Sequence, residues 1–293
     1  MIVAGSTAQS FATRLADELE EPLAPVRYHR FPDDEVLAAT PGTAADGLDR
    51  AVVVCSTTTP AAHLELLQLQ DAVREAGAGE VVTVLPYMGY ARQDRPVAPE
   101  FDAETTGYPV SARAVARAVS TGADRVVTVN PHERGVREFF DPPAETVDAA
   151  GRLAAALDRS TSPLFLAPDD GARGLARAVR DAHGAGDVDA FRKTRVSGSE
   201  VRLEPATVSV EGRPAVVVDD IVATGSTTCA AAAALREQGA TRVVVACVHP
   251  LLVGEARVDL ARAGVDRVVG TDTVERAVSD VSAAPAVAER LRS

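Results

Sequence analysis

The chain has 293 residues, which is long enough for two domains of ordinary size. Its formal net charge of −12 argues against a nucleic-acid groove, because such grooves are lined by basic residues. No run of about 18 apolar residues occurs, and no basic stretch precedes an apolar one at the amino terminus, so we expect a cytoplasmic protein with no membrane partner. The three cysteines are scattered without metal spacing.

The first predicted elements are a strand over 2–4 and an amphipathic helix over about 9–20. Residues 30–35, RFPDDE, place an aromatic side chain beside three acids in a proline-containing turn, and from these residues alone we expect an exposed loop. A second strand, all apolar, follows over 51–55. A helix over about 60–77 then begins with proline at its first position.

A repeated plan runs through the rest of the chain. Each copy is a glycine that ends a helix, a short polar turn and a buried strand, and the copies begin at Gly77, Gly122, Gly239 and Gly264. Helices that alternate with wholly apolar strands indicate a parallel sheet with helices on both faces, joined by right-handed crossovers. The sequence therefore predicts an α/β fold.

The two halves of the chain correspond. Residues 51–54 and 215–218 both read AVVV, and consecutive prolines at 142–143, which fit neither a helix nor a central strand, suit a linker. We expect two tandem domains, 1–142 and 143–293, each a mostly parallel sheet flanked by helices, with the tail of the second able to pack on the first.

The most informative stretch is 215–227, AVVVDDIVATGST. A buried strand stops at Asp219 and Asp220, a small-residue loop with Gly225 follows, and an alanine-rich helix is predicted from 228. Loop amides, hydroxyls and the positive end of a helix can together bind a phosphate. The two carboxylates suit sugar hydroxyls or a divalent cation. The alternative is a turn in which Asp220 only caps the helix.

The first half lacks the paired carboxylates. Cys55 and Ser56 stand at the positions that match the diacid of the second half. We therefore expect only the second half to bind a sugar phosphate.

Three further strand ends carry charged side chains. Residues 87–95, YMGYARQDR, hold two arginines, whose planar forks suit polyphosphate, at the edge where open α/β sheets bind ligands. His132 beside Glu133 could ligate a cation, and Asp169 or Asp170 could do the same after another strand. The alternatives are a solvated loop at 87–95, a structural or exposed histidine, and a helix N-cap.

Lys193 is the only lysine among 30 basic residues. Its retention suggests a task that a guanidinium cannot perform, such as concentrating charge on one transferring phosphorus group. Arg195 lies two residues further along an extended segment, so we expect it to face the same way. Chance survival of a single lysine is the alternative.

Taken together, FPDDE, YARQDR, NPH followed by FFD, APDDGA, KTR and VVDDIVATGST occur in the order found in ribose-phosphate diphosphokinases, and the chain resembles archaeal-type members of that family. The resemblance implies two phosphoribosyltransferase-like domains. It implies transfer of a diphosphoryl group from ATP to ribose 5-phosphate, with Mg²⁺ as cofactor. It also implies self-association that forms a shared ATP site.

The resemblance assigns roles to individual residues. Stabilising the transferring group falls to Lys193 and Arg195. The implied ATP contacts are Phe31, Asp33, Glu35, Arg92, Gln93 and His132, the first three across a subunit interface. The implied magnesium ligands are His132 and Asp169. The implied ribose 5-phosphate contacts are Asp219, Asp220, Ala223, Thr224, Gly225, Ser226 and Thr227.

The chain departs from the family pattern at three places. Asn130 stands where the family usually has aspartate, the segment 96–108 is longer and more acidic, and Thr194 replaces a common basic residue. Two alternatives stay open. One is a phosphoribosyltransferase, which needs only one domain with the diacid loop. The other is a catalytically silent homologue that regulates an active partner.

Overall fold

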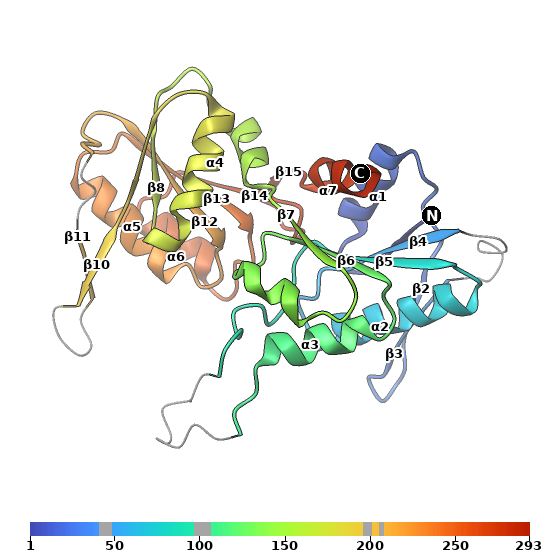
Figure 1. Ribbon diagram of the computed structural model, residues 1–293. Coiled ribbons are helices and arrows are strands. Elements are labelled where there is room, and N and C mark those ends of the chain that lie inside the picture. The colour runs from blue at the N-terminus through green and yellow to red at the C-terminus, as the bar shows by residue number, and fades with distance from the viewer. Residues whose placement is uncertain (41–48, 97–106, 196–200, 205–207) are drawn as a thin grey trace. The chain divides into compact units, whose positions relative to one another are not determined.

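A computed structural model describes residues 1–40, 49–96, 107–195, 201–204 and 208–293, and for 192–195 and 201–204 it describes the backbone alone. The described chain divides into two compact units, coloured along the sequence in Figure 1. Unit 1 contains residues 1–148, 273–275 and 283–293, and unit 2 contains residues 149–272 and 276–282. The expected segment 96–108 falls largely outside the described residues.

Within its described residues, unit 1 is built on a five-stranded parallel sheet in the order β1-β4-β5-β6-β7. Almost every side chain of β4, β5 and β6 is buried, because helices cover both faces of the sheet. The strands are β1 Ile2–Ala4, β4 Arg50–Val54, β5 Glu80–Leu85, β6 Arg125–Val129 and β7 Ala144–Val147. The helices are α1 Gln9–Leu19, α2 Pro60–Glu75, α3 Ser111–Ser120, η1 Arg134–Phe139 and α7 Ala284–Arg292.

Local sequence explains where α2 begins and ends. The Thr59 hydroxyl accepts a hydrogen bond from the Ala62 amide at 3.1 Å, and Pro60 occupies the first helical position. Gly77 then takes a left-handed φ of 95° two residues after the last helical residue. The predicted helix over about 60–77 is confirmed.

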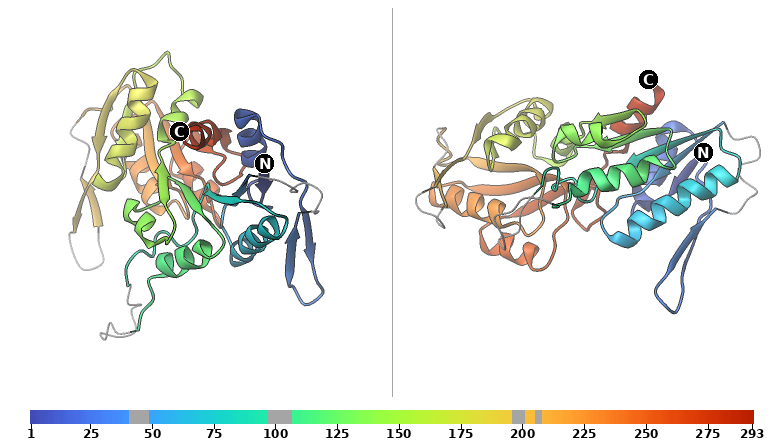
Figure 2. Two further views of the ribbon diagram at one scale, coloured as in Figure 1. Left: turned by 45° about the vertical axis from the view of Figure 1, so that its right-hand side comes forward. Right: turned by 60° about the horizontal axis from the view of Figure 1, so that its bottom comes forward.

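The acidic turn at residues 30–35 joins two strands rather than forming a free loop. Strands β2 Arg27–Arg30 and β3 Val36–Ala39 pair as an antiparallel hairpin, and Phe31 at its turn is 40% exposed. Figure 2 shows the turn of this hairpin extending away from unit 1, while Gln68 of α2 bonds the backbone of Val36 and Ala38 in β3. The expected exposure is confirmed, but the two flanking strands were not predicted because their side chains do not alternate in hydrophobicity.

The described part of unit 2 contains a six-stranded sheet in the order β15-β14-β13-β12-β8-β9, with every neighbouring pair parallel. The strands are β8 Leu164–Ala167, β9 Asp187–Ala190, β12 Pro214–Ile221, β13 Arg242–His249, β14 Arg267–Thr271 and β15 Ser279–Val281, with a separate antiparallel hairpin of β10 Arg192–Arg195 and β11 Val201–Glu204. The helices are η2 Ala150–Ala156, η3 Asp170–Ala172, α4 Arg173–His183, α5 Ser226–Glu237 and α6 Ala256–Arg262. The predicted α/β fold with two parallel sheets is confirmed.

The last helix of the chain packs on unit 1. Helices α7 and α1 lie side by side in Figures 1 and 2, and the Arg292 guanidinium donates to the Glu18 carbonyl. Arg290 also pairs with Glu145 in β7. The second half of the sequence thus contributes a helix to the first unit.

A short segment of the second half closes the carboxyl edge of the unit 1 sheet. The Ser56 hydroxyl donates to the Thr273 carbonyl at 2.5 Å. The amides of Ser10 and Phe11 donate to Glu275 Oε1 at 2.6 and 3.3 Å. Glu275 therefore occupies the positive amino end of α1. Ala8 at the N-cap has no side-chain oxygen that could accept hydrogen bonds there. In unit 1, the Glu275 carboxylate therefore accepts hydrogen bonds from helix amides that could otherwise bind an anion from solution.

We expect the Glu275→Ala variant to lose about 1 kcal/mol in the free energy of unfolding, because two helix amides lose their acceptor. Urea denaturation followed by circular dichroism measures this loss. Glu18→Ala, which removes an exposed carboxylate at the other end of α1, is the control and should keep wild-type stability. A Glu275→Ala variant as stable as the control would show that the contact contributes nothing.

Candidate active site

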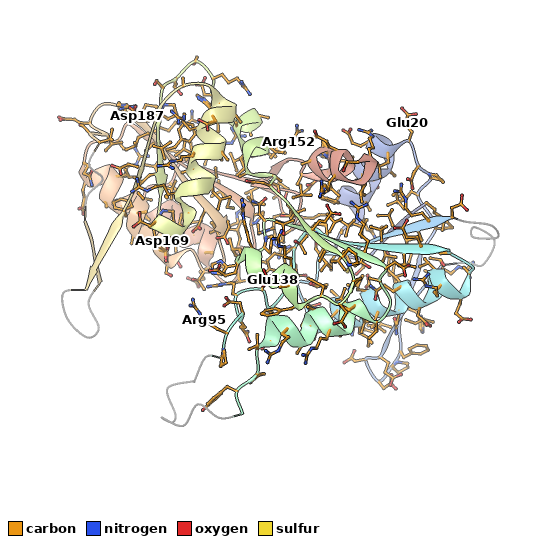
Figure 3. The ribbon with its side chains drawn as sticks, in the orientation of Figure 1. Glu20, Arg95, Glu138, Arg152, Asp169 and Asp187 are labelled. Atoms are coloured by element: carbon orange, nitrogen blue, oxygen red, sulfur yellow. The ribbon has the colours of Figure 1, made fainter. Side chains whose placement is uncertain are left out.

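Carboxylates from two adjacent strands meet at the carboxyl edge of the unit 2 sheet. Strand β12 ends with Asp219 and Asp220 followed by Ile221, and β8 ends two residues before Asp169. The two strands are parallel neighbours, so their ends lie at one edge of the sheet. Figure 3 places Asp169 near the start of α4 and Asp187 at the opposite end of this layer.

The electrostatics of this edge are set by crowding of negative charge. Burial, followed by the nearby Asp220 carboxylate, raises the pKa of Asp219 to about 8, and Asp169 contributes in the same direction. The Asp220 amide offsets part of this by donating to Asp219 Oδ1 at 3.0 Å. The same crowding of negative charge that raises this pKa favours the approach of a cation, which can take the place of the proton.

Asp169 also caps a helical turn. Its Oδ1 accepts a hydrogen bond from the Ala172 amide at 3.3 Å, at the start of η3. The N-cap alternative is therefore confirmed.

The carboxylates of unit 2 suit a magnesium ion that also binds substrate phosphates, rather than a metal held by protein ligands alone. Over the described residues, no cluster of three or more histidine, cysteine, aspartate or glutamate side chains is arranged to hold a metal. Magnesium commonly binds through one or two carboxylates together with substrate phosphates. Asp169, Asp219 and Asp220 supply such oxygens without forming a closed site.

The loop after the diacid has the geometry of an anion cradle. Gly225 takes a φ of 79° and α5 begins at the next residue, two positions earlier than predicted. A Cβ at Gly225 would lie 3.5 Å from its nearest neighbour, Leu260, so the backbone angle rather than space requires glycine. The side chains of Thr224 and Ser226 are exposed at the amino end of the helix. Loop amides and hydroxyls thus gather at the positive end of α5.

In unit 1, the segment after β5 places Arg92 and Gln93 at the carboxyl edge of the sheet. The Gln93 amide donates to the Tyr90 carbonyl at 2.8 Å. Gln93 also accepts from the start of α3, through its carbonyl from the Ala112 amide at 3.1 Å and through Oε1 from the Ser111 hydroxyl at 2.6 Å. Gln93 is therefore bonded to the turn at Tyr90 and to the start of α3, and Arg92 beside it is exposed.

Asn130 is bonded to a carboxylate further along the chain. Its φ is 35°, a left-handed angle that asparagine tolerates better than most residues, and its Nδ2 donates to Asp148 Oδ1 at 2.8 Å. Arg134 Nη2 lies 4.0 Å from Asp148 Oδ2. Asp148 therefore contacts residues on both sides of His132, which is itself exposed. A carboxylate is present near position 130 although the residue there is an amide.

The other predicted residues are distributed as follows. Phe31, Asp33 and Glu35 are exposed at the turn of the β2–β3 hairpin of unit 1. Lys193 and Arg195 lie in β10, and their side chains fall outside the described part of the structure. His132 belongs to unit 1 and Asp169 to unit 2.

The sequence did not predict a role for two carboxylates that contact candidate regions in the structure, Asp148 and Glu275. Asp148 follows β7, a strand too weakly apolar to be predicted so close to the proline pair. The rule that ligand-binding residues follow strand ends would have found Asp148 if β7 had been recognised. Glu275 carries no local signal, because its partners are more than 260 residues away in the sequence.

Comparisons with known proteins find a matching family model for each half of the chain. A family model described as the N-terminal domain of ribose phosphate pyrophosphokinase matches residues 1–122, and one described as a phosphoribosyl transferase domain matches residues 140–283. Ribose-phosphate pyrophosphokinase of Halobacterium salinarum is 58% identical over 292 residues, covering 99% of this chain and 100% of that protein. The Methanopyrus kandleri protein of the same name is 42% identical over 299 residues, covering 100% and 99%.

A solved structure has the same fold over the whole chain. The crystal structure of phosphoribosylpyrophosphate synthetase from Mycobacterium smegmatis superposes with a TM-score of 0.81 at 27% sequence identity, covering 100% of this chain and 97% of that one. Among the helices that the structure describes, each is too short or too polar to cross a lipid bilayer.

Stability should fall with rising pH because of Asp219. Its folded-state pKa of about 8 lies above that of a free aspartate, so its contribution to stability is complete at low pH and is lost as pH rises through about 8. In metal-free buffer, we expect Asp219→Asn to flatten the decline in the free energy of unfolding between about pH 5 and pH 9. Denaturation at a series of pH values measures this decline.

The control for this experiment is Asp181→Asn, which changes an exposed carboxylate on α4. It should keep the wild-type slope. Added Mg²⁺ should stabilise the wild type most at the alkaline end, where Asp219 has lost its proton. Identical slopes for Asp219→Asn and the wild type would contradict the assignment.

The hydrogen bond between Asn130 and Asp148 can be tested by swapping the two residue types. Asn130→Asp sets a second carboxylate 2.8 Å from the first, and we expect a loss of about 1 kcal/mol in the free energy of unfolding. Adding Asp148→Asn restores one amide and one carboxylate and should recover most of the loss. Hydrogen exchange of the amides of residues 132–134 should follow the same order. A double variant no better than Asn130→Asp would rule out the pairing.

Proposed function

The chain belongs to the ribose-phosphate pyrophosphokinase family, and on that premise we propose that it transfers the β,γ-diphosphoryl group of Mg-ATP to the C1 hydroxyl of ribose 5-phosphate, giving 5-phosphoribosyl 1-diphosphate and AMP. The observation that supports this most directly is the carboxyl edge of unit 2. There a strand, two carboxylates, a left-handed glycine and a helix amino end follow one another within 13 residues, 215–227. We place the reaction in the cytoplasm.

The sugar phosphate occupies the cradle of unit 2 in this proposal. The 5-phosphate accepts hydrogen bonds from amides and hydroxyls of Ala223, Thr224, Gly225, Ser226 and Thr227 at the positive end of α5. Asp219 and Asp220 accept from the ribose hydroxyls. A protonated Asp219 could also donate, because its pKa of about 8 keeps a proton near neutral pH. Holding the sugar at both ends orients its C1 hydroxyl.

His132 and Asp169 are the proposed magnesium ligands. When bound, magnesium neutralises phosphate charge and draws electron density from the phosphorus that is attacked. Asp169 stands at the edge where crowded carboxylates favour a cation. Asp148 and Asn130 hold the loop that carries His132.

ATP is proposed to contact Arg92 and Gln93 through its phosphates. Gln93 is fixed by bonds from α3, and the exposed guanidinium of Arg92 offers two donors in a plane. The adenine is assigned to Phe31, Asp33 and Glu35 of a second copy of the chain, so the proposal includes self-association. The exposure of this hairpin turn supports a contact with another molecule.

The chemical step needs little covalent participation by the protein. The C1 hydroxyl attacks the β-phosphorus, the bond to the α-phosphate oxygen breaks, and AMP leaves with that oxygen. Lys193 and Arg195 are assigned to the charge that develops on the transferring group. Positioning and neutralisation of charge account for most of the acceleration in this scheme.

One incubation separates this proposal from its alternatives. The protein is mixed with ATP, ribose 5-phosphate and Mg²⁺, and AMP is measured. The proposed enzyme releases AMP only when both substrates are present. A phosphoribosyltransferase or a silent homologue releases none, and that result would overturn the proposal.

Lys193→Ala tests the assigned catalytic lysine. We expect turnover to fall by roughly 10²- to 10³-fold, because a charge that acts mainly in the transition state is lost, while ATP binding measured by calorimetry changes little. Arg117→Ala, which removes an exposed charge on α3, is the control and should keep normal turnover. Near wild-type turnover of Lys193→Ala would refute the role.

A further inference from the structure

The turn that leads to Arg92 and Gln93 rests on a histidine that has no role so far. We propose that His63 is a positioning residue of the ATP site, whose ring holds the Gly89–Tyr90 turn so that Arg92 and Gln93 meet the ATP phosphates. This inference rests on the proposed function, which assigns those two residues to ATP. All the groups concerned belong to unit 1.

The first observation is how closely the chain at Gly89 approaches its neighbours. A Cβ at this position would lie 2.1 Å from the Thr57 carbonyl oxygen and 2.8 Å from His63 Cε1. The Gly89 amide donates to Thr57 Oγ1 at 2.9 Å, and the Thr57 amide donates to the Tyr87 carbonyl at 2.9 Å. Only glycine fits here, and the His63 ring forms part of the surface against which the turn lies.

The second observation is the strained backbone of Tyr90. Its φ is 64°, a left-handed angle that is unfavourable for an aromatic residue and persists only when surrounding contacts impose it. The ring of His63 meets the ring of Tyr90 edge to face, with 5.4 Å between centroids and 74° between planes. This contact favours the left-handed conformation.

The backbone angle at Tyr90 decides where the next residues lie. The Gln93 amide donates to the Tyr90 carbonyl at 2.8 Å, so residues 90–93 form one closed turn. If Tyr90 relaxed to an ordinary φ, this carbonyl would rotate away and the turn would open. Arg92 and Gln93 would then move from their present positions after β5, where Gln93 is bonded to the start of α3.

The third observation is the state of the His63 ring. Nδ1 lies 3.1 Å from the Thr59 carbonyl oxygen and therefore carries the proton, while Nε2 is buried and meets no hydrogen-bond partner among the described residues. Burial lowers the pKa of His63. Tyr90 is the titratable group packed on the ring. A second proton on Nε2 would be buried without an acceptor, so the neutral ring is the form that packs.

Two variants separate the ring from its nitrogens. His63→Ala removes both, and we expect the KM for ATP to rise about tenfold with kcat and the KM for ribose 5-phosphate nearly unchanged. His63→Phe keeps the ring against Tyr90 and should restore most of the affinity for ATP. Leu64→Ala, a neighbour on α2 that is 48% exposed, is the control and should match the wild type.

The pH profile gives a readout that loss of packing alone would not change. For the wild type, we expect the KM for ATP to rise as the pH falls into the acidic range and the ring takes a second proton, because burial lowers the pKa of His63. His63→Phe cannot be protonated and should lose this rise. A wild-type and a phenylalanine profile of the same shape would overturn the proposal.

Binding of ATP by calorimetry keeps the test independent of turnover. If the wild type releases no AMP but binds ATP, the proposed function fails, and weaker binding by His63→Ala still supports the positioning role. If His63→Ala does not fold, as judged by circular dichroism, His63→Phe and its pH profile decide the question. Unchanged ATP affinity in a folded His63→Ala protein, or equal loss for both substrates, would overturn the proposal.

Discussion

The placement of Asp219 beside Asp220 at the end of a buried strand is the constraint on which the rest of unit 2 depends. Two carboxylates that share one poorly hydrated edge are unfavourable to charge together, so one of them keeps a proton to about pH 8. Such an arrangement reduces the stability of the empty protein at alkaline pH. It is explained if a sugar hydroxyl or magnesium takes the place of that proton when substrate binds.

The two copies of the fold treat the same edge differently. In unit 2 the amino end of α5 follows a left-handed glycine and exposes hydroxyl groups. In unit 1 the corresponding edge is closed by the segment 273–275, and Glu275 takes two amides at the amino end of α1. Glu275 thus satisfies helix amides of unit 1 with a carboxylate of the chain itself, although α1 follows β1 and the helix that corresponds to α5 is α2, which follows β4. In the proposal, the sugar phosphate binds to unit 2 and the ATP-binding loops belong to unit 1.

Unit 1 holds its proposed ATP-binding loops through unusual backbone angles. Tyr90 lies in the segment after β5, Asn130 directly follows β6, and both have positive φ. Each is contacted by a side chain from another part of unit 1, His63 of α2 and Asp148 after β7. These contacts are individually modest, since an aromatic pair or a single hydrogen bond typically contributes about 1 kcal/mol to stability. Their value is geometric, because they decide where Arg92, Gln93 and His132 stand.

The sequence by itself determined the α/β class, the duplication and the order of strand, diacid, loop and helix that forms the proposed phosphate cradle, because hydrophobic runs, glycine stops and this order are local signals. It also offered Asp169 as either a helix cap or a cation ligand, and the structure shows the cap, while the cation role stays a proposal. Only the tertiary structure decided that Glu275 closes the first copy, that Asp148 pairs with Asn130, and that His63 lies under the Tyr90 turn. Those contacts join residues between 18 and 265 positions apart, and such pairings depend on how the strands are ordered in the sheet, which no local pattern specifies.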